Sequence, residues 1–349
     1  MKDHKKYMQR CLQLAKNGLG TTRPNPTVGA VVVYNDKIIG EGFTSPYGGP
    51  HAEVNAINTV KDKSLLPLST IYVTLEPCSH FGKTPPCADL IAKHTIKNVV
   101  IGCIDTNSLV AGKGIEKLKK AGCNVTVGVL ESECFDHHKR FFTVQNKKRP
   151  HVILKWAQTQ DGFIAPNHKD SVSPVWISNE YSKQLVHKFR SEEHAILVGT
   201  NTVIADNPSL TVRSWYGHNP IRVVLDKSLK LKKSLSVFDA KATTILITHN
   251  NNIRIADEKN EKLLIEKIDF SLPLASQICE VLHKHKIQSV IIEGGTKTIQ
   301  TFIDENLWDE AYVFEGKSVF KEGIAAPLLP KRGSETIDIE GDSLHIYKN

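Results

Sequence analysis

Three residues that are common zinc ligands stand in two short motifs of this chain. His51 belongs to the motif at 50–53, and Cys78 and Cys87 enclose a short proline-containing segment. One histidine and two cysteines supply three protein ligands. The fourth tetrahedral position is then left for water, which is the arrangement of a catalytic rather than a structural zinc site. Any fold of this chain must therefore bring residues 51, 78 and 87 together.

Glu53, two residues after the histidine, is placed to move protons between such a water and a substrate. Zinc deaminases combine H-x-E with P-C-x-x-C, and their glutamate is an acid and base rather than a ligand. Here the insert between the two cysteines, 79–86, is longer. Residues two apart point to different sides of a regular helix, so His51 and Glu53 converge only if His51 lies at an irregular first turn. The motifs predict deaminase-like chemistry with an additional loop.

Two other interpretations remain open at this stage. His80 lies within the insert, and as a fourth ligand it would close a structural zinc site and leave Glu53 without a role. A nucleic-acid deaminase would use the same zinc chemistry, and the net charge of +8 invites it. The basic residues are spread, however, with short clusters only at 146–149 and 230–233. Such a charge balance also suits phosphorylated small molecules.

The length of the chain indicates two domains. A chain of 349 residues exceeds what one hydrophobic core usually organises. The segment 143–150 is polar and basic and falls between two apolar patterns, so we predict domains at 1–146 and 147–349. No apolar run of signal-peptide or membrane length follows the N-terminus, and seven cysteines, an odd number, indicate a reducing compartment. We expect a cytoplasmic protein without a membrane segment.

Apolar periodicity predicts alternating strands and helices in both halves, which is typical of an α/β fold. In the first half we expect helices at 7–16, from about 51, from Cys87 and at 114–121, and strands at 28–34, 37–42, 71–75, 98–103 and 124–127. In the second half we expect strands at 152–157, 195–199, 221–225, 244–248 and 290–293, with a helix at 179–189.

Three segments of the second half have the composition of binding sites. At 292–296 an apolar strand runs into two glycines and then a helix, which presents backbone amides suited to phosphate. At 199–213 small hydroxyl residues, a carboxylate, a proline turn and Arg213 lie close together, as in a site for a ribose phosphate. At 155–165 a strand breaks into an Asp-Gly turn. Each segment alone is weak evidence for a binding site, since ordinary surface turns have similar compositions.

Over nearly all its length, the chain resembles the bacterial bifunctional deaminase/reductase family of riboflavin biosynthesis. The resemblance rests on 23–30, 50–53 and the complete segment 76–87 in the first half. In the second half it rests on 155–162, 194–197, 199–213 and 293–295. It implies a cytidine-deaminase-like α/β/α N-terminal domain and a dihydrofolate-reductase-like α/β C-terminal domain.

The resemblance implies two successive reactions on a phosphoribosyl diaminopyrimidinone. A zinc-dependent hydrolytic deamination comes first, and NADPH then reduces the ribosyl group to a ribityl chain. The implied partner is this small molecule, with neither nucleic acid nor membrane, and a homo-oligomer is compatible with the sequence.

The resemblance also assigns roles to individual residues. The zinc ligands are His51, Cys78 and Cys87, and Glu53 is the proton shuttle. Matching cofactor-contact positions are Ala157, Trp176, Thr202, Asp206, Gly295, Thr296, Lys297 and Thr298. Matching substrate-contact positions are Asn25, Lys155, Arg190, Leu210, Arg213 and Glu293. The chain departs from the family at Pro174 and Lys227, where serine is usual.

Overall fold

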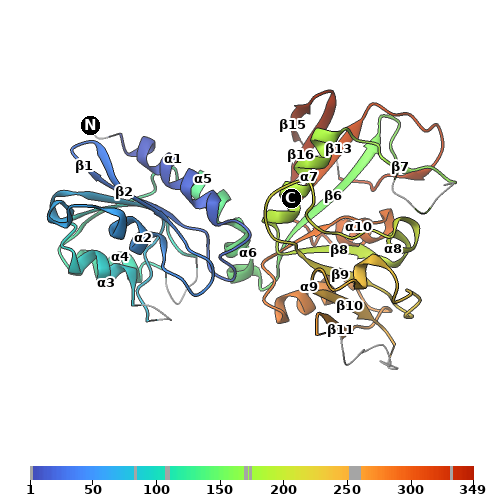
Figure 1. The fold of residues 1–349 in the computed structure, drawn as a ribbon, viewed down its shortest axis with the longest axis horizontal. Helices are drawn as coiled ribbons and strands as arrows, with labels where there is room; N and C mark the ends of the chain where they lie inside the picture. Colours follow the sequence, from blue (N-terminus) through green and yellow to red (C-terminus); the bar gives the residue numbers. More distant parts are fainter. Residues whose placement is uncertain are drawn as a thin grey trace. The chain divides into compact units, whose positions relative to one another are not determined.

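The chain folds as two compact units, Met1–Lys148 and Arg149–Asn349, each with a hydrophobic core of its own (Figure 1). The computed structural model describes residues 3–81, 85–106, 111–168, 172, 175–250, 261–330 and 333–349. Pro174 and part of the insert between Cys78 and Cys87 lie outside these ranges. Within them, no helix combines the length and the apolar character needed to cross a bilayer.

The first unit is built on a five-stranded sheet in the order β2-β1-β3-β4-β5. Strands β1 and β2 form an antiparallel hairpin, β1 is also antiparallel to β3, and β3, β4 and β5 are parallel. The strands are β1 Gly29–Tyr34, β2 Lys37–Phe43, β3 Thr70–Leu75, β4 Asn98–Cys103 and β5 Asn124–Val127. Every residue of β3 is buried, as expected for a central strand covered on both faces.

Helices cover both faces of this sheet (Figure 1). Helices α1 and α5 lie on one face, and α2, α3 and α4 lie on the other. The helices are α1 His4–Ala15, α2 Ala52–Thr59, α3 Cys87–Lys93, α4 Lys113–Lys120, α5 Glu131–His137 and α6 Lys139–Lys147. The arrangement is the α/β/α sandwich expected for the N-terminal half.

Two glycines let helix α2 lie directly on strand β2. A Cβ added at Gly42 would be 2.4 Å from the backbone nitrogen of Ala56, and one at Gly40 would be 2.3 Å from the Ala56 carbonyl oxygen. No other residue type fits between strand and helix at this separation, because the obstacle is backbone. This close packing fixes α2, whose N-cap is His51 and whose first turn carries Glu53.

The second unit contains a nine-stranded sheet in the order β11-β10-β9-β8-β12-β6-β13-β16-β15. Pairings from β11 to β13 are parallel, and β16 and β15 add antiparallel strands at one edge. The strands are β6 His151–Thr159, β8 Ala195–Gly199, β9 Ile221–Leu225, β10 Thr244–Thr248, β11 Leu263–Lys267, β12 Ser289–Ile292, β13 Glu310–Gly316, β15 Ser334–Ile339 and β16 Asp342–Lys348.

In the described part of this unit, four α-helices and a small second sheet accompany the large sheet. The helices are α7 Glu180–Glu192, α8 Thr200–Asp206, α9 Leu274–Lys284 and α10 Thr296–Asp304. The small sheet pairs β7 Phe163–Ala165 with β14 Ile324–Ala325. Helices α8 and α10 follow β8 and β12 directly, so both begin where parallel strands end.

The alternation of strands and helices predicted for both halves is confirmed. The segment 143–150, in which we placed the domain boundary, includes the end of helix α6, which continues to Lys147 and buries Phe142 and Thr143. Its polar, basic composition belongs to the exposed side of an amphipathic helix. Lys148, in a left-handed conformation, ends the helix.

Replacing Gly42 by alanine should destabilise the first unit. The added Cβ would meet helix backbone, so the free energy of unfolding should fall by about 1–3 kcal/mol, the usual cost of overpacking. Urea denaturation followed by circular dichroism measures this. Gly333→Ala is the control, because a Cβ at that position meets nothing within 4 Å. An unchanged transition for Gly42→Ala would show that α2 can move away from β2 without cost.

Candidate functional site

The three predicted metal ligands meet in the first unit. His51 is the N-cap of α2 and has an extended backbone conformation, so it lies at the irregular helix start that its spacing from Glu53 required. Cys78 follows β3, and Cys87 is the first residue of α3. The ligand atoms of these three residues all lie within 4.8 Å of one another.

The distances within this group fit zinc. His51 Nδ1 lies 3.6 Å from Cys78 Sγ and 3.4 Å from Cys87 Sγ. Ordinary zinc–nitrogen and zinc–sulfur bonds at a tetrahedral angle place two such atoms about 3.5 Å apart. The hydrogen bond from Cys87 and the neighbouring His51 lower the pKa of Cys78, whereas the same hydrogen bond, with burial, raises the pKa of Cys87. Without a metal the two thiols therefore share a proton, and Cys78 is the one that more readily becomes a thiolate ligand.

Glu53 is buried beside this group, with only 4% of its surface exposed. The pKa of Glu53 is raised to about 7, mainly because the side chain is buried and secondly because Cys78 is close to it. A carboxyl group with a pKa near neutrality can both accept and donate a proton at physiological pH, which is what general acid–base catalysis needs. The position and the environment of Glu53 suit a proton shuttle.

His80 does not join the three ligands. Its side chain is exposed, and among the described His, Cys, Asp and Glu residues the only group close enough to share a metal ion is His51, Cys78 and Cys87. The geometry therefore favours an open site over a closed four-ligand site. Asn25, the predicted substrate contact of this half, is half-buried in the turn before β1, where its backbone nitrogen donates to Thr22.

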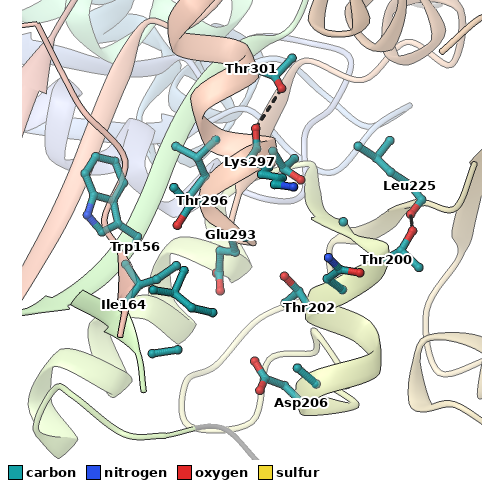
Figure 2. Close-up of a pocket in the computed structure, with 18 of the residues that line it drawn as sticks. Trp156, Ile164, Thr200, Thr202, Asp206, Leu225, Glu293, Thr296, Lys297 and Thr301 are labelled. Atoms are coloured by element: carbon teal, nitrogen blue, oxygen red, sulfur yellow. Dashed lines mark hydrogen bonds between the residues drawn. The ribbon is translucent and has the colours of Figure 1, made fainter. Parts of the chain in front are cut away.

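A cavity of about 1140 Å³ opens in the second unit (Figure 2). It lies where β8, β9 and β12 end, beside the middle of β6, which is where open parallel sheets bind ligands. Figure 2 shows Thr202 and Asp206 of α8 on one side and Thr296 and Lys297 of α10 on another. Gly294 allows the two helix starts to approach, because a Cβ there would be 3.0 Å from Thr202 Oγ1.

Most of the predicted cofactor contacts line this cavity. They are Ala157, Thr202, Asp206, Gly295, Thr296, Lys297 and Thr298. Trp176 does not line it. Trp176 is 59% exposed, and the Lys183 ammonium lies 4.0 Å from the centre of its ring. Lys227, where the family usually has serine, also lines the cavity.

The predicted substrate contacts separate into two groups. Lys155 and Glu293 line the cavity, and Arg190 binds Glu293 directly. Leu210 is a core residue, 3% exposed and packed with Val198 and Val203. Arg213 lies on the following loop, where its side chain donates to the hydroxyls of Ser209 and Thr211. Leu210 can offer a ligand only its backbone or an edge of its side chain.

A buried carboxylate organises the charged end of the cavity. Arg190 donates to both oxygens of Glu293, from Nε at 2.9 Å and from Nη2 at 2.7 Å, and Lys155 Nζ lies 3.5 Å from Glu293 Oε2. Burial alone would raise the pKa of Glu293, but Arg190 and Lys155 lower it to about 2. Arg213 lies near Arg190 and Glu293, so the positive side chains outnumber the single carboxylate in this group. His187 was not predicted from the sequence. Burial and the two arginines lower its pKa to about 4, so it is neutral at physiological pH.

Substitution of single candidate ligands should separate the open from the closed zinc site. His80→Ala should retain about one zinc per chain, because three ligands remain in place. Cys87→Ala should lose most of the metal. The zinc content of each variant after gel filtration, measured by atomic absorption, distinguishes the open three-ligand site from the closed four-ligand site. Loss of zinc in His80→Ala would instead indicate a four-ligand structural site.

Comparisons with known proteins match both units. Residues 1–103 match the cytidine and deoxycytidylate deaminase zinc-binding region, and residues 150–316 match the RibD C-terminal domain. The riboflavin biosynthesis protein RibD of Aquifex aeolicus (strain VF5) is 42% identical over 95% of this chain and 92% of its own length. RibD of Escherichia coli (strain K12) is 34% identical over 88% of this chain and 86% of its own.

Solved structures agree over both units. A diaminohydroxyphosphoribosylaminopyrimidine deaminase/5-amino-6-(5-phosphoribosylamino)uracil reductase from Thermotoga maritima is 38% identical, with a TM-score of 0.87 over 99% of this chain and 98% of its own. Acinetobacter baumannii RibD is 32% identical, with a TM-score of 0.86 over the same shares. The protein is thus a bifunctional enzyme of riboflavin biosynthesis with a zinc-binding deaminase domain and a reductase domain, and the chain belongs to the RibD family.

Proposed function

We propose that the first domain hydrolytically deaminates a phosphoribosyl diaminopyrimidinone and that the second uses NADPH to reduce the ribosyl group of the product to ribityl. The observation that carries the first step is the convergence of three zinc ligands beside the buried Glu53. The name of the Thermotoga maritima relative contains both activities and supports the choice of substrate. We assign the deaminase to 1–146 and the reductase to 147–349.

In the deaminase domain, His51, Cys78 and Cys87 would hold zinc. Zinc supplies a Lewis acid that lowers the pKa of a coordinated water towards neutrality. Glu53 accepts a proton from the attacking water and passes it to the amino group, which leaves as ammonia. Its burial beside the ligands keeps this proton from exchanging freely with solvent. Asn25 contributes to holding the pyrimidine substrate.

In the reductase domain, NADPH supplies the hydride. Helix α8, through Thr202 and its last residue Asp206, and the start of α10, through residues 295–298, hold the cofactor, with Ala157 as a further contact. Trp176, which lies outside the cavity, stays a predicted contact only. Backbone amides and hydroxyls at these two helix starts suit phosphate groups. Their position at the ends of β8 and β12 supports a cofactor that lies across the strand ends.

The charged end of the same cavity binds the sugar phosphate of the substrate. Lys155, Arg190 and Arg213 supply positive charge, and Leu210 lies close to Arg213 in the same segment. Glu293 holds Lys155 and Arg190 in fixed positions, so the phosphate meets a preorganised pair of cations. We expect the partner to be a small molecule rather than a nucleic acid, because these cations gather around the buried Glu293, which lines the cavity. The cytoplasmic location and a homo-oligomeric state remain predictions.

Glu53→Gln should keep the metal and lose ammonia release. An amide cannot shuttle the proton, so the rate of deamination should fall by about 100- to 10,000-fold. Ammonia release from the diaminopyrimidinone measures this, and zinc content shows that the ligands are intact. NADPH oxidation with the already deaminated substrate provides a control within the same chain. Deamination at the wild-type rate would mean that another group is the acid and base.

Glu293→Gln should impair the reductase and change the acid stability of its domain. A pKa held near 2 instead of its ordinary 4.5 corresponds to about 3 kcal/mol of stability at neutral pH. This depressed pKa stabilises the folded state above about pH 4.5, and the contribution is lost as pH falls towards 2. The variant should lack that part of the pH dependence in urea unfolding. It should also have a higher KM for the deaminated substrate, with ammonia release unchanged.

Unchanged reductase kinetics in a folded Glu293→Gln protein would contradict the proposed substrate end. A parallel loss of ammonia release would point to a defect in the whole chain instead.

A further inference from the structure

Glu76 stands between strand β3 and the ligand Cys78, and the mechanism above does not use it. Its side chain is buried, with 6% exposed. Oε1 accepts hydrogen bonds from the backbone nitrogens of Gly114 at 2.8 Å and Ile115 at 3.2 Å. Oε2 accepts from those of Gly112 at 3.0 Å and Asp105 at 3.4 Å. Four backbone N–H groups therefore converge on one carboxylate.

These hydrogen bonds replace the missing cap of helix α4. The first N–H groups of a helix have no partner within the helix and are usually satisfied by the side chain of the N-cap residue. The N-cap of α4 is Gly112, which has no side chain to offer. Glu76, from a distant strand, accepts from the second and third helical residues instead. A carboxylate is well suited to this position, since charge-assisted hydrogen bonds are the stronger kind.

The same contact ties α4 to the backbone next to Cys78. A Cβ added at Gly114 would lie 2.1 Å from the carbonyl oxygen of Pro77, so the start of α4 rests directly on the residue before the ligand. On the other side, the Cys78 carbonyl accepts from Ala88 N of α3 at 3.2 Å. The backbone of Cys78 is thus held between α3 and the Glu76–α4 contact.

We propose that Glu76 is a positioning residue of the deaminase: its four hydrogen bonds anchor the 76–78 backbone to α4 and so place the Cys78 sulfur for zinc. The inference rests on the proposed zinc-dependent deamination. A residue that only stabilised α4 would alter unfolding and leave metal affinity unchanged. A positioning residue must change the affinity for zinc, because Cys78 Sγ would no longer be held at the distance that zinc requires.

Glu76→Gln tests this role with the smallest change of shape. Each carboxylate oxygen accepts from two N–H groups, so either orientation of the amide points its NH2 at two donors. We expect the zinc dissociation constant, measured by chelator competition, to rise by about 10- to 100-fold, as for other residues that orient metal ligands. The kcat for ammonia release should fall with KM little changed. NADPH oxidation should be unaffected.

Glu116→Gln is the matched control. It makes the same substitution in the first turn of α4, but Glu116 is exposed and is not among the hydrogen-bond partners of Glu76. Its zinc affinity and kcat should equal those of the wild type. Gly114→Ala supplies a second, independent test, because it keeps the carboxylate and pushes α4 away from Pro77. It should weaken zinc binding in the same way.

If Glu76→Gln does not fold, Gly114→Ala decides alone. Wild-type zinc affinity and kcat in the folded variant would overturn the inference while leaving the proposed function intact. A wild-type chain that binds no zinc or releases no ammonia would overturn the proposed function instead.

Discussion

Buried carboxylates that follow parallel strands, each surrounded by donors from other elements, organise both halves of this protein. Glu76 follows β3 and accepts four backbone N–H groups, and Glu293 follows β12 and pairs with Arg190 and Lys155. A buried charge is costly unless hydrogen bonds and opposite charges compensate it. The donors must therefore stay in place for the carboxylate to stay buried. Each carboxylate links the elements that carry its site.

The two domains use this constraint differently. In the deaminase domain the donors are neutral backbone groups, and the positive charge of the site is left to the metal that His51, Cys78 and Cys87 are arranged to hold. In the reductase domain the donors are themselves cations, so the carboxylate leaves a surplus of positive charge that suits a phosphate. Glu53 contrasts with Glu293. Both are buried, but the pKa of Glu53 rises to about 7 because no cation outweighs its burial, whereas that of Glu293 falls to about 2.

Many elements could be predicted from the sequence because their signals are local. The strands at 98–103, 124–127, 195–199 and 221–225 have the predicted bounds, since each is a short segment rich in β-branched residues, either largely apolar or alternating. Among the elements that were not predicted are helix α9 and the strands β15 and β16 at one edge of the large sheet. Five of the six residues of β15 are exposed, so the strand carries little apolar pattern, and its place is set by pairing with β16. Helix α6 was not predicted, because its exposed polar and basic face dominates its composition.

The sequence by itself determined the chemistry that is available: one histidine, two cysteines and a glutamate at the spacing of a zinc deaminase, and glycines and hydroxyls at two strand ends. These features consist of residue types and their spacing, and they can be recognised in short segments of the sequence. Only the tertiary structure decided which side chains meet. It left His80 in solvent, placed Leu210 in the core and Trp176 outside the cavity, and brought Glu76 to the start of α4. Such contacts join residues far apart in the chain, and their geometry depends on packing between elements, which no local pattern of residues encodes.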